Sequence, residues 1–283
     1  MVNFLAYLFY FVASTASPIQ RRWLATVKSA EPNNQIRFAF HVSLVISILG
    51  LSLLFYEPFQ IRGDLFLMSL AAAACGIFGA ASYIALYVAQ KHVEAGVTSV
   101  VSNIYTPITI ILSSVLLHEK LTDIQIVGTV FLFIGMIIIS KKHRIGRFKF
   151  DKYFLLMILS GILLGFLLTS ERYLQKTTGF TTGALISWWA TCLFLGIASS
   201  FTKNNHSYSK SDLLITGGLR FAQNLSWVSL VFVVGNLSVV SAITTFKVVL
   251  MFIVGFFLLH ERGDLTRKIV GVGIAMLGLL FMK

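Results

Sequence analysis

Two basic side chains fall inside long apolar stretches of this 283-residue chain, where a charge needs water or a counter-charge. Arg220 lies eight residues after Asp212, which begins one such stretch, and Lys247 lies near the middle of the next. A charged residue at the centre of a bilayer costs at least ~2.5 kcal/mol, so its presence there points to a function. We therefore expect Lys247 and Arg220 to bind an anionic group.

Arg220 begins a polar face on its predicted helix. Gln223, Asn224 and Trp227 follow it at spacings of three, four and seven residues, which places all four side chains on one side of an α-helix. Such a face is costly against lipid, so we expect it to look into a helix bundle. The two amides suit polar substituents of a ligand, and the indole suits an apolar or ring portion.

Two residues on other stretches are expected to complete the same site. Asn103 stands close to Pro107, where a kink frees backbone carbonyls of the fourth stretch. We assign Asn103, with the two amides above, to the recognition of polar groups. Tyr83, on the third stretch, is assigned with the indole to packing against a ring or apolar portion.

The two cations are expected at a similar depth and without an acidic partner. A very short turn at Gly235 joins their helices, and at 1.5 Å per residue Arg220 lies about 22 Å and Lys247 about 18 Å from it. Six acidic residues near the apolar stretches all fall at predicted ends: Glu57, Asp64, Glu119, Glu171, Asp212 and Glu261. Unpaired cations in a low-dielectric interior favour water or an anion, and that anion can be the substrate.

The elements that position these residues are membrane spans. The chain is 57% hydrophobic and 12% charged, with a mean hydropathy of +0.83, which is far outside the soluble range. Ten apolar runs have the length that a bilayer demands of a helix: 2–18, 38–56, 64–88, 95–117, 123–140, 153–170, 179–201, 212–234, 237–259 and 267–282. We interpret the first as a retained helix rather than a signal peptide. The net charge of +12 is assigned to loops beside anionic lipid, with no nucleic-acid partner.

The chain contains a tandem repeat. The tetrapeptide Leu-Leu-His-Glu occurs at 116–119 and 258–261, and Ile-Val-Gly follows at 126–128 and 269–271. The repeat predicts a first half at 1–140, a basic linker at 141–152 and a second half at 153–283. Because each half holds five spans, the second enters the membrane from the opposite side, which makes an inverted repeat. The predicted fold class is all-α integral membrane, with ten transmembrane helices as two inverted five-helix repeats.

The sequence resembles the EamA-type members of the drug/metabolite transporter (DMT) superfamily across essentially its whole length. The residues that carry the resemblance are Pro107, Glu119, Gly128, Gly135, Glu261, Gly271 and Gly278. One departure is that the second half has no proline matching Pro107, and Lys247 or its neighbours occupy that region. The resemblance implies a transporter fold and leaves the substrate open, since relatives handle amino acids, sugars, nucleotide-linked compounds and drugs.

Several conspicuous residues have structural interpretations. Glu119 and Glu261 are either proton carriers or, as we favour, markers of a turn at a helix end. The repeated glycines have the spacing of close helix packing. Other residues are interpreted as interfacial anchors (Tyr7, Tyr10), structural aromatics (Trp188, Trp189), packing cysteines (Cys75, Cys192) and a hydrogen-bonded interfacial histidine (His41).

We expect a secondary carrier, not an enzyme, that moves a small polar metabolite with a carboxylate or phosphate group, of amino acid or organic anion type. The sequence has no P-loop, so ATP does not drive it directly, and the lack of a visible mid-span carboxylate favours facilitated diffusion or exchange. The alternatives are a DMT-type efflux pump for cationic or amphipathic drugs and a membrane-embedded enzyme, for which no catalytic motif is found.

The expected partners are a small-molecule substrate and the lipid bilayer, with no cofactor and no metal. We predict a multi-pass protein of a bacterial-type cytoplasmic (inner) membrane, as a monomer or homodimer.

Overall fold

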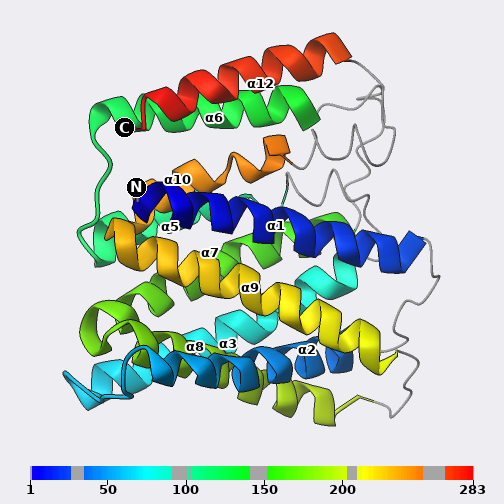
Figure 1. The fold of residues 1–283 in the computed structure, drawn as a ribbon, viewed down its shortest axis with the longest axis vertical. Coiled ribbons are helices and arrows are strands. Elements are labelled where there is room, and N and C mark those ends of the chain that lie inside the picture. Colours follow the sequence, from blue (N-terminus) through cyan, green and yellow to red (C-terminus); the bar gives the residue numbers. More distant parts are fainter. Residues whose placement is uncertain are drawn as a thin grey trace.

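The computed structural model describes residues 2–26, 35–90, 101, 103–140, 152–202, 209–250 and 265–282, and within these ranges it contains helices and turns but no strand (Figure 1). The labelled helices are α1 (Val2–Thr26), α2 (Gln35–Gly50) with the 3₁₀ turn η1 (Leu51–Phe55), α3 (Leu65–Gln90), α5 (Tyr105–Leu116), α6 (Asp123–Ser140), α7 (Lys152–Thr178), α8 (Phe180–Ser200), α9 (Lys210–Val234), α10 (Leu237–Thr244) and α12 (Leu265–Leu280). Residues 247–250 are also helical. The predicted all-α class is confirmed.

Four of the described helical segments are long and apolar enough to cross a membrane: Gln35–Phe55, Leu65–Ala89, Lys152–Thr178 and Phe180–Ser200. Shorter apolar helices accompany them. Large apolar side chains such as Ile48, Ile111 and Leu193 are exposed on the outer faces, which is the surface that a bilayer covers. The count of ten spans in two inverted halves stays a prediction.

Two of the predicted continuous spans are interrupted. Residues 103–104 form a turn directly before α5, and residues 245–246 form a turn directly after α10. At both places a backbone amide donates a hydrogen bond to the carbonyl three residues earlier instead of four. The Thr106 amide donates to the Asn103 carbonyl (3.0 Å), and the Val248 amide donates to the Thr245 carbonyl (3.1 Å). Pro107 lies in the first turn of α5, where its missing N–H is tolerated, so the helix breaks before the proline rather than at it.

The predicted end of the sixth span at residue 170 is wrong, because α7 continues to Thr178. The polar residues beyond 170 are turned into the protein: Glu171, Arg172 and Gln175 are all buried, so their polarity does not mark the membrane edge. Inside the bundle α7 lies against α3, where Ser82 and Ser160 each donate a 2.9 Å hydrogen bond to the carbonyl of the other.

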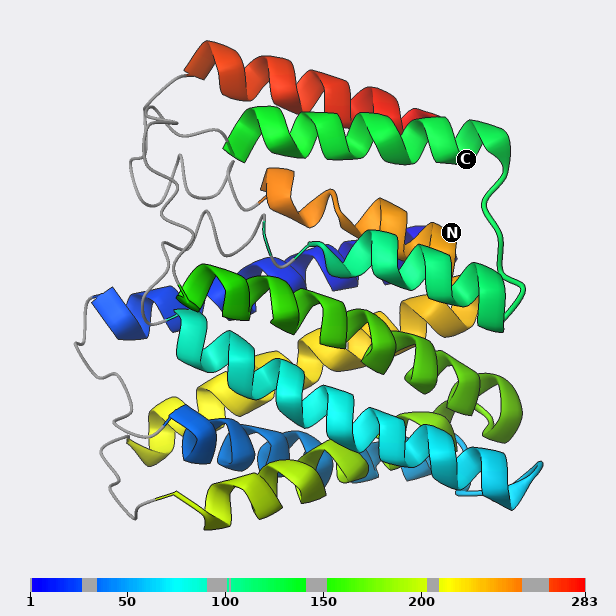
Figure 2. The same ribbon diagram turned by 180° about the vertical axis from the view of Figure 1, so that it is seen from behind.

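The paired glycines bring α6 and α12 into direct contact, which agrees with the close helix packing expected from their spacing. A Cβ atom added at Gly128 would lie 2.8 Å from the carbonyl oxygen of Gly278, and one at Gly135 would lie 2.7 Å from that of Gly271. No side chain fits at either place, so the two backbones touch. Figures 1 and 2 show these helices side by side along one edge of the bundle.

Glu119 fastens the end of the bundle where the α2–α3, α5–α6, α7–α8 and α9–α10 turns gather, at the left of Figure 1. Its carboxylate pairs with Arg172 (3.0 Å) and Lys176 (3.3 Å) of α7, and it accepts a 2.6 Å bond from the Leu237 amide at the start of α10. A carboxylate is favourable at a helix N-terminus. These contacts agree with the structural role expected of Glu119, whereas Glu261 lies outside the described residues.

Candidate binding cavity

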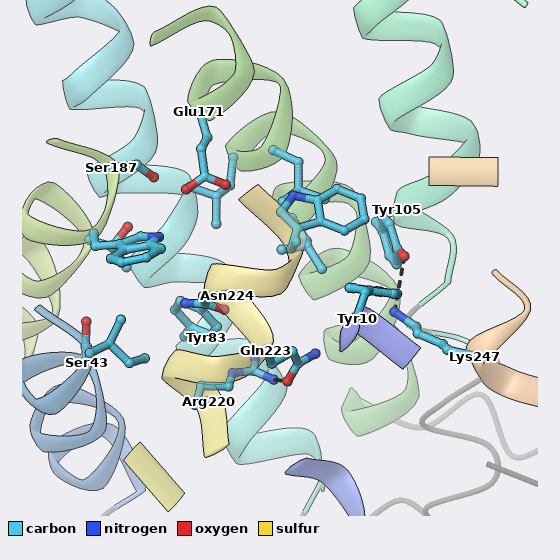
Figure 3. Close-up of a pocket in the computed structure, with 17 residues that line it drawn as sticks. Tyr10, Ser43, Tyr83, Tyr105, Glu171, Ser187, Arg220, Gln223, Asn224 and Lys247 are labelled. Carbon is cyan, nitrogen blue, oxygen red and sulfur yellow. Dashed lines mark hydrogen bonds between the residues drawn. The ribbon is translucent and has the colours of Figure 1, made fainter. Parts of the chain in front are cut away.

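A cavity of about 90 Å³ lies inside the bundle (Figure 3). Six of the seven residues proposed from the sequence line it: Tyr83 from α3, Arg220, Gln223, Asn224 and Trp227 from α9, and Lys247 just after α10. The remaining lining residues are Tyr10, Ser43, Ile46, Tyr105, Leu164, Leu167, Leu168, Glu171, Ser187, Trp188 and Thr191. The polar face expected on the eighth predicted span therefore does look into the bundle.

Arg220 is held by neutral groups. Its Nη1 donates a 2.9 Å hydrogen bond to Oε1 of Gln223, one helical turn along α9. The guanidinium carbon lies 5.2 Å from the centre of the Tyr83 ring, which is a cation–π distance. The Nε–H group is buried without a hydrogen-bond partner among the described residues. A donor in that position is available to a ligand.

Lys247 is held in a similar way on the other side of the cavity. Its Nζ donates a 3.1 Å hydrogen bond to Oη of Tyr105 and lies 4.7 Å from the centre of that ring. The Tyr105 ring meets Trp227 edge-on at 6.3 Å, and Trp227 lies 5.7 Å from the Tyr10 ring. Lys247 is therefore bordered by an aromatic wall drawn from α1, α5 and α9.

Glu171 is the cavity residue that the sequence argument placed elsewhere. It was expected at the end of a span, but it lies within α7, is 6% exposed and lines the cavity. The side chains of Ser187 and Trp188 on α8 line the same cavity beside it. The printed sequence carried a signal, because Glu171, Gln175 and Thr178 recur at helical spacing beyond residue 170.

Three other expectations need correction. Asn103 is fully buried in the turn before α5 and is not among the cavity-lining residues, because the chain turns at 103–104 instead of continuing as the regular helix that the expectation assumed. Tyr10 is not an interfacial anchor but is 2% exposed and lines the cavity. Trp188 also lines it, whereas Trp189 stacks on Phe59 toward the outside, with ring centres 6.2 Å apart.

Other residues whose side chains could take part in chemistry do not line the cavity. Cys75 and Cys192 are buried free thiols. Nδ1–H of His41 donates a 2.9 Å hydrogen bond to the Arg37 carbonyl, within the same helix. In the part of the chain that the structure describes, no group of three His, Cys, Asp or Glu side chains is arranged to hold a metal ion.

Comparison with known proteins gives the family. A model of the EamA-like transporter family matches residues 1–141. The chain belongs to the EamA-like transporter family. An uncharacterized transporter of Archaeoglobus fulgidus is 35% identical over 69 residues, and the match spans 24% of this chain but only 25% of that relative's length. The resemblance drawn from the repeat is thereby confirmed.

The fold of this EamA-family protein also occurs among solved structures. One crystal structure matches it with a TM-score of 0.70, covering 98% of this chain and 97% of the other. The two sequences are 13% identical, so this likeness shows a shared fold. With the apolar helices described above, the family makes the chain a multi-pass integral membrane protein.

Proposed function

We propose that this EamA-family protein is a secondary carrier that moves a small polar metabolite with a carboxylate or phosphate group across the membrane by alternating access. The observation that carries the proposal is the charge of the cavity. Arg220 and Lys247 both line it, and among the described residues neither forms an ion pair with a carboxylate. Their hydrogen-bond partners, Gln223 and Tyr105, are neutral.

Neutral partners offset a buried cation less well than an anion does. An anionic group that enters the cavity gains from both cations, and it also meets the unpartnered Nε–H of Arg220. The amides of Gln223 and Asn224 are placed to receive polar substituents, and Trp227 and Tyr83 to border a ring or apolar portion. Asn103, which lies outside the cavity lining, has no part in this form of the proposal.

The size of the cavity favours a small metabolite. One water needs roughly 10–15 Å³ of such space, and the cavity offers about 90 Å³. It therefore has room for roughly six to nine water-sized positions, which corresponds to a ligand of about as many non-hydrogen atoms. Small carboxylic acids, amino acids and phosphate esters fall in this range.

The inverted repeat that alternating access needs is supported by equivalent positions that meet. Lys247 contacts Tyr105, 142 residues earlier in the chain, and the same interval separates the two Leu-Leu-His-Glu copies. The helix breaks at 103–104 and 245–246 are related by that interval as well. Interrupted helices at the contact of two inverted halves are the usual place of a carrier's central site.

A cationic-drug efflux pump is the second candidate, and Glu171 is the observation that favours it. A carboxylate in the cavity is what such a pump needs to meet a cation. The same cavity holds two cations against this one carboxylate, so its net charge is positive even with Glu171 ionised. An anion or a carboxylate-bearing zwitterion is therefore the better match.

The deciding experiment is ligand-induced thermal stabilisation of the purified protein. The panel contains matched anionic, zwitterionic and cationic compounds of six to nine non-hydrogen atoms, tested on wild type and Lys247→Gln. Lys210→Gln, which makes the same change at an exposed position on α9, is the control. Anions or zwitterions should stabilise wild type and the control but not Lys247→Gln. Stabilisation by cations alone, or an unchanged response of Lys247→Gln, contradicts the proposal.

A further inference from the structure

The bundle contains two buried carboxylates in opposite surroundings. Glu119 is 8% exposed and is compensated by Arg172, Lys176 and the Leu237 amide. Glu171 is 6% exposed, and among the described residues it forms no ion pair. Burying an ionised carboxylate without a counter-charge is unfavourable, and binding a proton is the ordinary way to remove the cost.

Glu171 lies on the part of α7 that lines the cavity. It lies seven residues before Thr178, where α7 ends, which is about 10 Å along the helix axis. Arg220 and Lys247 line the same cavity, and Figure 3 shows Arg220 below Glu171 and Lys247 to its lower right. A ligand between Glu171 and the two cations therefore feels the charge of all three groups.

The groups that line the cavity together with Glu171, or lie close to it, come from several helices. Helix α8 contributes Ser187 and Trp188, whose side chains do not titrate in the usual range. The titratable and charged groups are Cys75 and Tyr83 on α3, Tyr105 on α5, Tyr10 on α1, Arg220 on α9 and Lys247 after α10. The thiol and the phenols are neutral near pH 7 in ordinary peptides, so Arg220 and Lys247 are the charged side chains that line the same cavity as Glu171.

We propose that Glu171 is a proton-binding site, and that its proton is coupled to the anionic substrate held by Arg220 and Lys247. This inference rests on the proposed function. The cavity that Glu171 lines also contains the two cations Arg220 and Lys247. When an anion neutralises them, the same carboxylate faces added negative charge and takes up a proton. Because such coupling is reciprocal, a proton on Glu171 also strengthens anion binding.

The coupling gives a transport stoichiometry that balances. The carboxylate takes one proton from the solution that the cavity faces while the cations take one anion from it. After the halves rock, the anion and the proton leave to the other side and Glu171 is ionised again. One proton thus crosses with each anion, which replaces the uncoupled diffusion or exchange expected from the sequence.

The test is infrared difference spectroscopy of the purified full-length protein during a pH titration. A protonated carboxyl group has a C=O stretching band that an ionised one lacks. Wild type should show such a band growing as the pH falls, and it should be missing from Glu171→Gln. Asp123→Asn, which removes an exposed carboxylate at the start of α6, should keep it. Glu171→Asp, which keeps a carboxyl group, should show the band with a shifted midpoint.

The probe anions are acetate and inorganic phosphate, compared with chloride at equal ionic strength. A probe that thermally stabilises the protein should lower the proton concentration at the midpoint of the band at least threefold. If no band disappears in Glu171→Gln, or if Glu171→Asp leaves the band unchanged, the proton site is wrong. If a stabilising anion leaves the midpoint in place, the coupling is wrong although the carrier proposal stands. If no anion stabilises the protein and tetraethylammonium instead displaces the proton, the carrier proposal fails and this coupling fails with it.

Discussion

Lys247 donates a 3.1 Å hydrogen bond to the phenol oxygen of Tyr105, 142 residues earlier in the chain. The same interval separates Glu119 from Glu261 in the repeated tetrapeptide. The lysine and the tyrosine thus occupy matching positions, each two residues beyond the first residue of a helix break. At this position the second repeat has a cation, Lys247, and the first has an aromatic hydrogen-bond acceptor, Tyr105. The two repeats therefore contribute different chemistry to the cavity at equivalent backbone positions.

Tyr105→Phe should strengthen anion binding, because the phenol oxygen competes with an anion for the Lys247 ammonium. The ring and its 4.7 Å contact with Nζ are retained in phenylalanine, while one hydrogen bond of about 0.5–1.5 kcal/mol is lost. We expect a stabilising anion to bind roughly three- to tenfold more tightly. Dose-dependent thermal shifts would measure this, with Tyr56→Phe at an exposed position as control. Weaker binding would mean that the phenol itself contacts the anion.

Glu119→Gln should destabilise the protein much more than Lys176→Ala. The Glu119–Arg172 pair is 8% and 7% exposed, whereas the Lys176 side chain is 42% exposed. Breaking a buried pair leaves an uncompensated charge and costs about 3–5 kcal/mol, while an exposed pair contributes about 1 kcal/mol or less. Unfolding in detergent, followed by intrinsic fluorescence, gives both values. Equal losses in the two variants would show that the burial of Arg172 is unimportant.

The position of Arg220 and Lys247 inside the bundle could be predicted from the sequence because its evidence is local. Arg220, Gln223 and Asn224 share a helix face by spacing alone, and an apolar stretch around them fixes their depth. Lys247 lies near the middle of its apolar stretch, about ten residues or ~15 Å from either end, which is beyond the reach of its side chain. Neither argument requires knowledge of which helices are neighbours, so both residues were placed in the cavity correctly.

Glu171 and Asn103 could not be placed in this way, because tertiary contacts decide their surroundings. The cluster Ser170-Glu171-Arg172 has the composition of a span end. Arg172 is nevertheless buried, and its charge is paired with Glu119, which is 53 residues away in the sequence. Asn103 follows the expected helical spacing until the chain turns at 103–104. A helix break changes the direction of every later side chain, and periodicity does not locate it.

Gly135→Ala should separate α6 from α12. The new methyl group would lie 2.7 Å from the Gly271 carbonyl oxygen and 2.8 Å from the Ala275 amide nitrogen, and neither backbone atom can move independently. Overpacking of this kind costs about 1–3 kcal/mol. Gly273→Ala on α12 meets nothing within 4 Å, so it should instead gain up to about 1 kcal/mol from helix propensity. Thermal unfolding of the two variants in parallel checks the sign of each, and a stabilised Gly135→Ala would contradict the contact.

Gln175→Met should stabilise the protein. The Gln175 side chain is 3% exposed, and neither its oxygen nor its nitrogen has a hydrogen-bond partner among the described residues. An unsatisfied buried polar group costs about 1–3 kcal/mol, and an apolar side chain of similar shape removes that cost. Gln125→Met is the contrast, because Oε1 of Gln125 accepts a 3.0 Å bond from the Thr122 amide at the start of α6, so its loss should destabilise. Thermal unfolding in detergent measures both changes. A less stable Gln175→Met would show that the Gln175 amide has a hydrogen-bond partner, such as a water molecule. Because Gln175 lies one helical turn beyond Glu171, the polar interior of α7 would then extend past the cavity.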